Sequence, residues 1–150
     1  MNKTFNLKYQ VIMFIVMVLV GIFLNPMNIL AYRLDDLYIA LTLLYSGLIM
    51  ASNMIWAHEL VHLLNYGMMN NTLFFGGIIL TFIFSLLIRG QLMVNDQQWL
   101  RRMISHHSTA LTTSYKINEN TTNNEIKQLS KEIIDTQERE IKYMKQLLVF

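Results

Sequence analysis

The chain has 150 residues, of which 53% are hydrophobic and only 15% charged, a smaller charged share than soluble domains usually have. The net charge is +2 and charges of both signs are interspersed, so the sequence offers no extended basic surface for nucleic acid. Cysteine is absent, which excludes disulfides and thiolate ligands, and any site for a soft metal must use methionine and histidine.

The charged residues concentrate in the last part of the chain. Residues 1–90 contain four Lys or Arg and three Asp or Glu, whereas residues 91–150 contain eight and seven. A bilayer core excludes charged side chains, and water favours them. We therefore predict two domains: a transmembrane domain over residues 1–90, embedded in the lipid bilayer, and a water-exposed helical domain over residues 91–150.

Three apolar segments are long enough to cross a bilayer, which takes about 20 residues. We place these spans at about residues 9–30, 37–57 and 73–88. Asn25 and Pro26 are expected to bend or end the first span. A cleaved signal peptide is the alternative for this segment, but its apolar core is long and no small-residue cleavage site follows it.

The basic residues around the spans predict an orientation. Lys3 and Lys8 precede the first span, which favours a cytoplasmic N-terminus. Three spans then place the C-terminal domain in the periplasm or outside the cell. Arg89, at the end of the third span, argues for the opposite orientation.

His58, Glu59 and His62 form the pattern H-E-x-x-H at the end of the second span. On a helix the two histidines face one way and can bind zinc, with the glutamate as general base of a metallopeptidase. Catalytic zinc normally takes three protein ligands, however, and residues 63–95 contain no Asp, Glu or His. The alternatives are a two-histidine metal site and a polar end of the span near the lipid headgroups.

The C-terminal domain reads as two amphipathic helices, over about residues 96–116 and from a cap at Thr122 or Asn123 to about Leu148. A short connection makes them an antiparallel hairpin. A lone hairpin of this size buries too little surface to be stable in water. We therefore expect it to pack on the membrane domain, on a second copy in a homo-oligomer, or on another helical partner.

Met103, His106 and His107 stand at positions i, i+3 and i+4 of the first of these helices, so their side chains share one face. Thioether and imidazole are ligands suited to Cu(I). With a loop centred near Asn120, Met103 would face Gln137. Met144 would then lie nearer to Met103 than to the two histidines. The alternative is that the histidines are ordinary surface residues and the methionine fills the core.

Two segments, "LRRMISHHSTALTTSYKI" and "EIKQLSKEIIDTQEREIKYMKQLL", resemble the family named domain of unknown function 305. Two segments of the membrane part, "LAYRLDDLYIALTLLYSGLIMA" and "LLIRGQ", resemble the membrane-anchored branch of that family. The resemblance implies a ferritin-like helical fold and copper binding. It also implies metal ligation by Met103, His106, His107 and Met144.

The same resemblance gives Gln137 and Glu140 supporting roles behind the ligands or in helix pairing. The alternative for Glu140 is an ion pair with Arg101 or Arg102 across the hairpin. Two departures from the family pattern are Ser105, in place of the usual proline, and Thr113, where many members have methionine. The first removes a preset helix-start residue, and the second removes one soft ligand.

The sequence thus predicts an all-α membrane protein with three transmembrane helices followed by a two-helix antiparallel ferritin-like hairpin. We expect it to bind or buffer copper, with zinc as the alternative ion, and no catalytic turnover is implied. The alternative functions are a membrane zinc metallopeptidase that uses residues 58–62 and a structural membrane protein with an oligomerising helical tail.

Overall fold

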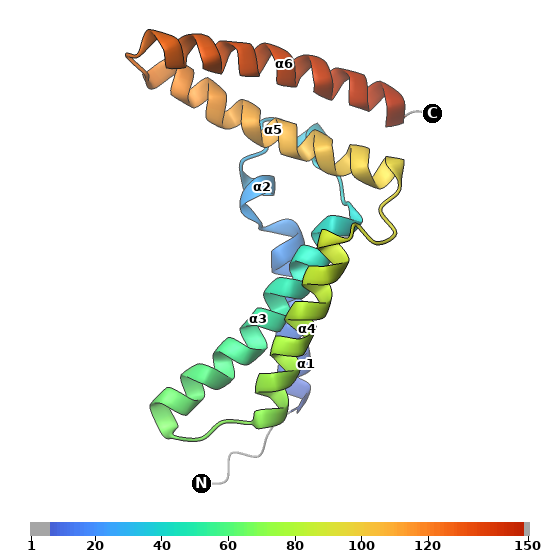
Figure 1. Ribbon diagram of the computed structural model, residues 1–150, viewed down its shortest axis with the longest axis vertical. Helices are drawn as coiled ribbons and strands as arrows, with labels where there is room; N and C mark the ends of the chain where they lie inside the picture. The colour runs from blue at the N-terminus through green and yellow to red at the C-terminus, as the bar shows by residue number, and fades with distance from the viewer. Residues whose placement is uncertain (1–6, 149–150) are drawn as a thin grey trace. The chain divides into compact units, whose positions relative to one another are not determined.

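The computed structural model describes residues 7–148, and over this range its regular structure is entirely helical (Figure 1). The predicted all-helical class is confirmed, while Lys3, used above for orientation, lies outside the described residues. The elements are α1 (Leu7–Phe23), α2 (Pro26–Ile29), the 3-10 helix η1 (Leu34–Asp36), α3 (Leu41–Tyr66), α4 (Asn71–Arg89), α5 (Asp96–Asn120) and α6 (Asn124–Leu148).

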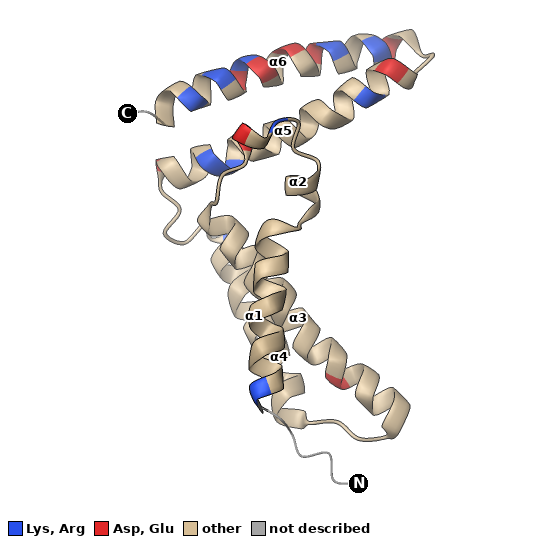
Figure 2. Ribbon diagram, turned by 180° about the vertical axis from the view of Figure 1, so that it is seen from behind, with Lys and Arg blue, Asp and Glu red and all other residues tan. Residues whose placement is uncertain are grey.

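The chain divides into two compact units. We call residues 7–23 and 42–93 the apolar unit, and residues 24–41 and 94–148 the hairpin unit. Most charged side chains lie on α5, on α6 and on the connection between α1 and α3 (Figure 2). The charge break near residue 90 did not indicate that the connecting segment, residues 24–41, belongs with the C-terminal helices.

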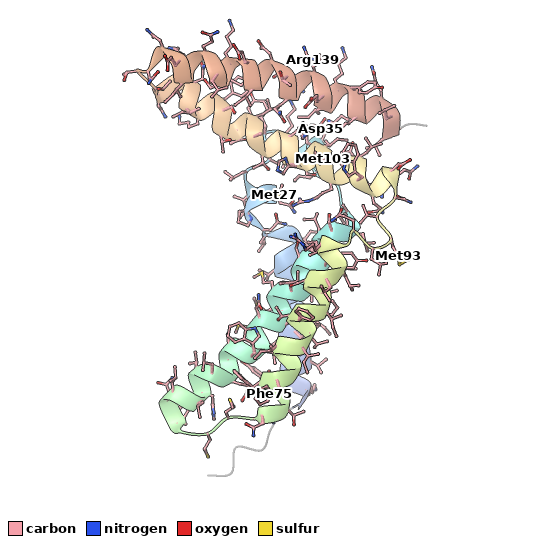
Figure 3. The ribbon with its side chains drawn as sticks, viewed as in Figure 1. Met27, Asp35, Phe75, Met93, Met103 and Arg139 are labelled. Carbon is pink, nitrogen blue, oxygen red and sulfur yellow. The ribbon has the colours of Figure 1, made fainter. Side chains whose placement is uncertain are left out.

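In the apolar unit, glycines bring α1, α3 and α4 close together. A Cβ added to Gly47 on α3 would lie 2.7 Å from the Val18 carbonyl oxygen on α1. Gly77 on α4 also lies close to α3, where an added Cβ would lie 3.0 Å from the Trp56 nitrogen and 3.2 Å from the Ser52 carbonyl oxygen. Small residues at such crossings allow close helix packing. Large apolar side chains are exposed on α1 and α4, including Ile15 and Leu19 on the first and Phe82 on the second. Phe75, also exposed on α4, is labelled in Figure 3.

Two of the described helical segments, not three, are long and apolar enough to cross a membrane: Lys8–Ile29 and Asn71–Arg89. They qualify by length and composition. The predicted second span, residues 37–57, is in fact a helix that begins at Leu41 and continues to Tyr66. Polar side chains along it, such as Asn53 and His58, lower its mean hydropathy.

The predicted break after the first span is present. α1 ends at Phe23, and α2 begins at Pro26 with Asn25 as its N-cap. The Asn25 side-chain oxygen accepts a hydrogen bond from the Asn28 N–H at 3.1 Å. The break follows from the missing N–H of proline together with the preference of asparagine for capping positions.

The two long helices of the hairpin unit run antiparallel, as predicted, and enclose an apolar core between them (Figure 1). Its buried members are Leu100, Ile104, Leu111, Ile134, Ile141 and Met144. α5 continues through Asn120 instead of ending near Lys116, so the predicted pairing register is wrong. His107 lies level with Glu140, and Asn118 lies level with Lys127 and Ser130. Residues 117–120 thus extend α5 beyond its predicted end, before Asn123 caps the start of α6.

Residues 24–41 pack along one side of α5 through hydrogen bonds to small hydroxyl side chains. The Ser108 hydroxyl accepts from the Tyr32 N–H at 2.9 Å and donates to Asp36 Oδ2 at 2.7 Å. The Ser105 hydroxyl donates to the Asp36 carbonyl at 2.8 Å. Asp36 is only 1% exposed. The hairpin is therefore supported by this segment of its own chain, an arrangement that the sequence did not predict.

Candidate metal centre

His107 occupies the middle of α5 and is largely shielded from solvent, with 13% of its side chain exposed. Its Nδ1 is buried without an aligned hydrogen bond and lies 3.1 Å from Glu140 Oε2 on α6. Burial lowers the pKa of His107; Glu140 opposes this effect and His106 reinforces it. The ring is therefore neutral at pH 7, which is the form in which imidazole binds metals.

The other predicted ligands lie at different depths of the same hairpin. Met144 is buried in the hairpin core, and Met103 is half-buried and packs against that core (Figure 3). His106 is exposed, and its ring stands edge-on to the His107 ring at a centroid separation of 6.0 Å. The structure thus combines a shielded imidazole, two thioethers at the core and one solvent-facing imidazole on the same hairpin.

Glu140 contacts His107, and not Arg101 or Arg102 as the alternative interpretation expected. The corrected register explains this contact: with Met103 facing Gln137, as predicted, His107 would face a residue about seven positions before Glu140, so the observed register differs by nearly two helical turns. Arg102 instead points to the other side of α5, where its Nη2 lies 2.6 Å from the Met27 sulfur. Gln137 is half-buried one turn before Glu140 on α6.

These residues fit a soft cation better than a hard one. Among residues 7–148, no three His, Cys, Asp or Glu side chains are grouped so that they could hold a metal ion. A site on the hairpin must therefore draw on methionine sulfur, which favours Cu(I). The Glu140 carboxylate beside Nδ1 resembles the carboxylate that commonly orients a ligating histidine, so Nε2 is the nitrogen left to bind.

The second predicted site, on α3, is arranged differently. The His58 and His62 rings are 6.4 Å apart. Glu59 is buried, and its Oε2 accepts a hydrogen bond from the Asn70 N–H at 2.8 Å, at the start of α4. His62 Nδ1 lies 2.8 Å from the Met68 carbonyl oxygen. The glutamate and the second histidine therefore hold the turn between α3 and α4 in this structure.

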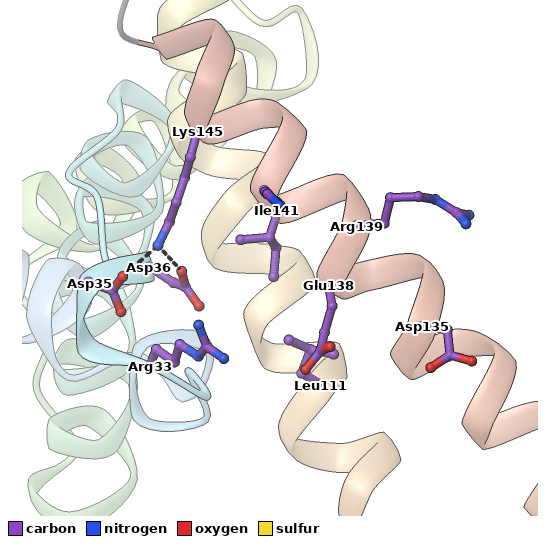
Figure 4. Close-up of a pocket in the computed structure, with 10 residues that line it drawn as sticks. Arg33, Asp35, Asp36, Leu111, Asp135, Glu138, Arg139, Ile141 and Lys145 are labelled. Atoms are coloured by element: carbon purple, nitrogen blue, oxygen red, sulfur yellow. Dashed lines mark hydrogen bonds and ion pairs between the residues drawn. The ribbon is translucent and has the colours of Figure 1, made fainter.

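A group of charged residues that the sequence did not single out lies on the other side of the hairpin. Lys145 Nζ lies 2.7 Å from Asp35 Oδ2 and 2.6 Å from Asp36 Oδ1 (Figure 4). These residues border a groove of about 710 Å³ between α6 and residues 33–36. One sequence signal was available: Ser105, Ser108 and Thr109 form a small polar stripe on an otherwise amphipathic helix. Such a stripe indicates a polar partner.

The fold and site define an all-helical protein in which apolar helices are joined to a charged two-helix hairpin that carries adjacent histidines on α5. Residues 88–148 match the model of the family described as domain of unknown function (DUF305), and the chain belongs to this family. An uncharacterized protein of Acanthamoeba polyphaga mimivirus is 31% identical over 139 residues, covering 93% of this chain and 91% of the relative. That similarity includes the apolar helices as well as the hairpin. No solved structure matches the chain.

Proposed function

We propose that this protein is a membrane-anchored metal-binding protein whose hairpin unit binds a soft ion, copper in particular. Met103, His106, His107 and Met144 would supply the ligands, with Glu140 orienting His107. The proposed role is to hold or buffer the ion. The observation that carries the proposal is the shielded, neutral imidazole of His107, which lies beside a carboxylate and on the same helix face as a methionine.

The surface of the apolar unit supports the membrane anchor. Large hydrophobic side chains remain exposed along α1 and α4, with Ile15 52% and Phe82 64% exposed. Exposed apolar helix surfaces of this extent are unusual for a soluble protein and typical of lipid contact. Residues 24–41 and 94–148 meet in the hairpin unit, so the chain between them must leave that unit and return. α4, one of the two helical segments that are long and apolar enough to cross, would make this excursion with α3, a longer but less apolar helix, beside it, and α1 would cross as well.

Copper titration of the purified full-length chain tests the metal proposal. A chromophoric Cu(I) competitor should report stoichiometric binding to the wild-type protein. The double variant His106→Ala/His107→Ala should lose this binding, and Glu140→Gln should weaken it by roughly 10- to 100-fold, as expected for a carboxylate that orients a ligand. The matched control is His58→Ala/His62→Ala, which removes two histidines outside the hairpin and should bind copper as the wild type does.

Two results would contradict the proposal. Absence of stoichiometric copper from the wild-type protein would favour a structural role for the hairpin. Loss of bound zinc only in the variant of His58 and His62 would favour the peptidase interpretation of residues 58–62.

A further inference from the structure

The hairpin has two broad sides, and they differ in what they contact. On one side, α5 receives residues 24–41 through Ser105 and Ser108, and α6 reaches the same segment through Lys145. Helical geometry places a different set of residues on the opposite side, which we call the open face. Among the described residues, the contacts of segment 24–41 with Ser105, Ser108 and Lys145 lie on the first side, so the open face is a candidate interaction surface.

The open face carries an apolar pattern with a polar centre. On α5 it presents Trp99 and Ile117 near the two ends, 51% and 45% exposed, with His106 between them. On α6 it presents Leu129 and Leu147, 56% and 43% exposed, with Glu140 between them. Each helix therefore has a large apolar residue toward each end and one ionisable residue near the middle. On each helix these residues are about seven and eleven positions apart, spacings that return to the same helix face and that helices packed side by side use.

We propose that a second copy of this chain packs on the open face and forms a two-fold dimer whose two hairpins make a four-helix bundle. A two-fold axis parallel to the helices keeps every residue at its own level and places α5 of one copy over α6 of the other. The register across the interface is then fixed by the register within the hairpin. Within the hairpin His107 lies level with Glu140, and Asn118 lies level with Lys127 and Ser130. These levels determine which residue of the second copy each open-face residue would contact.

The resulting pairs are complementary along the whole interface. Ile117 meets the partner's Leu129, and Trp99 meets the partner's Leu147. His106 meets the partner's Glu140 near the centre. Symmetry repeats each pair, so four apolar contacts surround two histidine–carboxylate contacts. At the centre an imidazole N–H can donate a hydrogen bond to a carboxylate, which favours this self-pairing, whereas lipid would leave both polar groups unpaired.

The dimer would also complete the metal site proposed above. His106 is the ligand candidate that the single hairpin leaves in solvent, and the second copy would cover it together with Met103. This consequence rests on the proposed function, but the dimer itself does not, because its contacts involve no metal.

Mixed cysteine cross-linking in intact cells tests the dimer, since the native chain has no cysteine to interfere. Two differently tagged chains are co-expressed, one with Ile117→Cys and the other with Leu129→Cys, and treated with a short, membrane-permeable bismaleimide in the presence of a metal chelator. A cross-linked product carrying both tags is expected. The matched control replaces Leu129→Cys by Lys131→Cys, an exposed position on α6 that is turned away from the open face, and should give little product.

A second variant tests the energetics. Leu129→Glu should weaken self-association by roughly tenfold or more, as for an apolar residue within an interface, while the helical content measured by circular dichroism stays unchanged. Equal cross-linking at Leu129 and Lys131, or capture of a different protein at Leu129, would overturn the proposal. Cross-linking that persists in a protein shown not to bind copper would refute the metal proposal alone and leave the dimer standing.

Discussion

At the scale of single residues, the pair of His107 and Glu140 shows how position controls ionisation. Burial lowers the pKa of His107, and the nearby carboxylate counteracts only part of this effect. The ring stays neutral in the folded chain at a pH where the unfolded chain would already bind a proton. Stability from this residue should therefore fall as the pH drops below about 6.5 towards the lower folded-state pKa.

Glu140→Gln should lower the pKa of His107 further, because the substitution removes the negative charge that favours the imidazolium while the burial remains. A pH titration followed by NMR of the His107 ring protons measures the change. Glu132→Gln, which removes a carboxylate from the same helix at an exposed position, is the control and should leave the pKa of His107 unchanged. A rise in the pKa of His107 in the Glu140 variant would contradict this account.

Lys145 is the second residue whose environment determines its effect. Burial disfavours its charge, but hydrogen bonds with Asp35 and Asp36 outweigh burial and raise the pKa of Lys145. The same hydrogen bond lowers the pKa of Asp35. The stabilisation from this cluster should therefore be lost as the pH falls below 3.8 through the lowered pKa of Asp35. It should also be lost as the pH rises above 10.5 through the raised pKa of Lys145.

Lys145→Met should lower the free energy of unfolding of the hairpin unit by about 3 kcal/mol, because it leaves the buried Asp36 carboxylate without its cationic partner. Hydrogen exchange of the amides in residues 24–41 and α5 measures this loss. Lys142→Met, an exposed change on the same helix, should change the free energy by no more than about 0.5 kcal/mol. Similar effects of the two substitutions would show that the contact with Asp36 contributes little.

At the scale of elements, α5 shows how one helix serves two contacts. Its apolar residues, such as Ile104 and Leu111, face α6, whereas Ser105 and Ser108 face residues 24–41. Asp36 is thereby enclosed with hydrogen-bond partners, which is the condition for burying a carboxylate at acceptable cost. The serine in place of the family's usual proline has a structural use here, because its hydroxyl binds the connecting segment.

The glycine crossings of the apolar unit lead to a prediction for adjacent elements. Gly47→Ala should destabilise the packing of α1 on α3 by about 1–3 kcal/mol, because the new methyl group would lie within 2.7 Å of a backbone oxygen. Gly76→Ala is the control, since a Cβ at Gly76 meets nothing within 4 Å and alanine favours helix. Thermal unfolding in detergent compares the two. Equal melting temperatures would indicate that α1 and α3 do not depend on this crossing.

At the scale of the whole molecule, the proposed anchor predicts which parts of the chain share a side of the membrane. Single cysteines at Leu34 and Thr122, both exposed in the hairpin unit, should react with a membrane-impermeant maleimide from the same side. A cysteine at Met68, in the turn between α3 and α4, should react only from the other side. Labelling of all three positions from one side would contradict a crossing by α3 and α4.

The sequence by itself determined the helices, most of their ends, the antiparallel hairpin and the family. These features depend on local signals: apolar periodicity defines helix faces, and residues such as Asn25 and Asn123 cap helix starts through atoms two or three residues away. The family motif is likewise contiguous in sequence. Such information is present in short stretches of the chain and needs no knowledge of distant residues.

Only the tertiary structure decided which faces meet. Residues 24–41 pack on α5, and Lys145 pairs with Asp35 and Asp36. Glu140 lies beside His107, and Glu59 accepts a hydrogen bond at the start of α4. Most of these contacts join residues far apart in sequence, and the pairing of Glu140 with His107 depends on a register that shifts by nearly two helical turns when α5 continues a few residues longer. A local pattern cannot fix that register, because the packing of both surfaces selects it together.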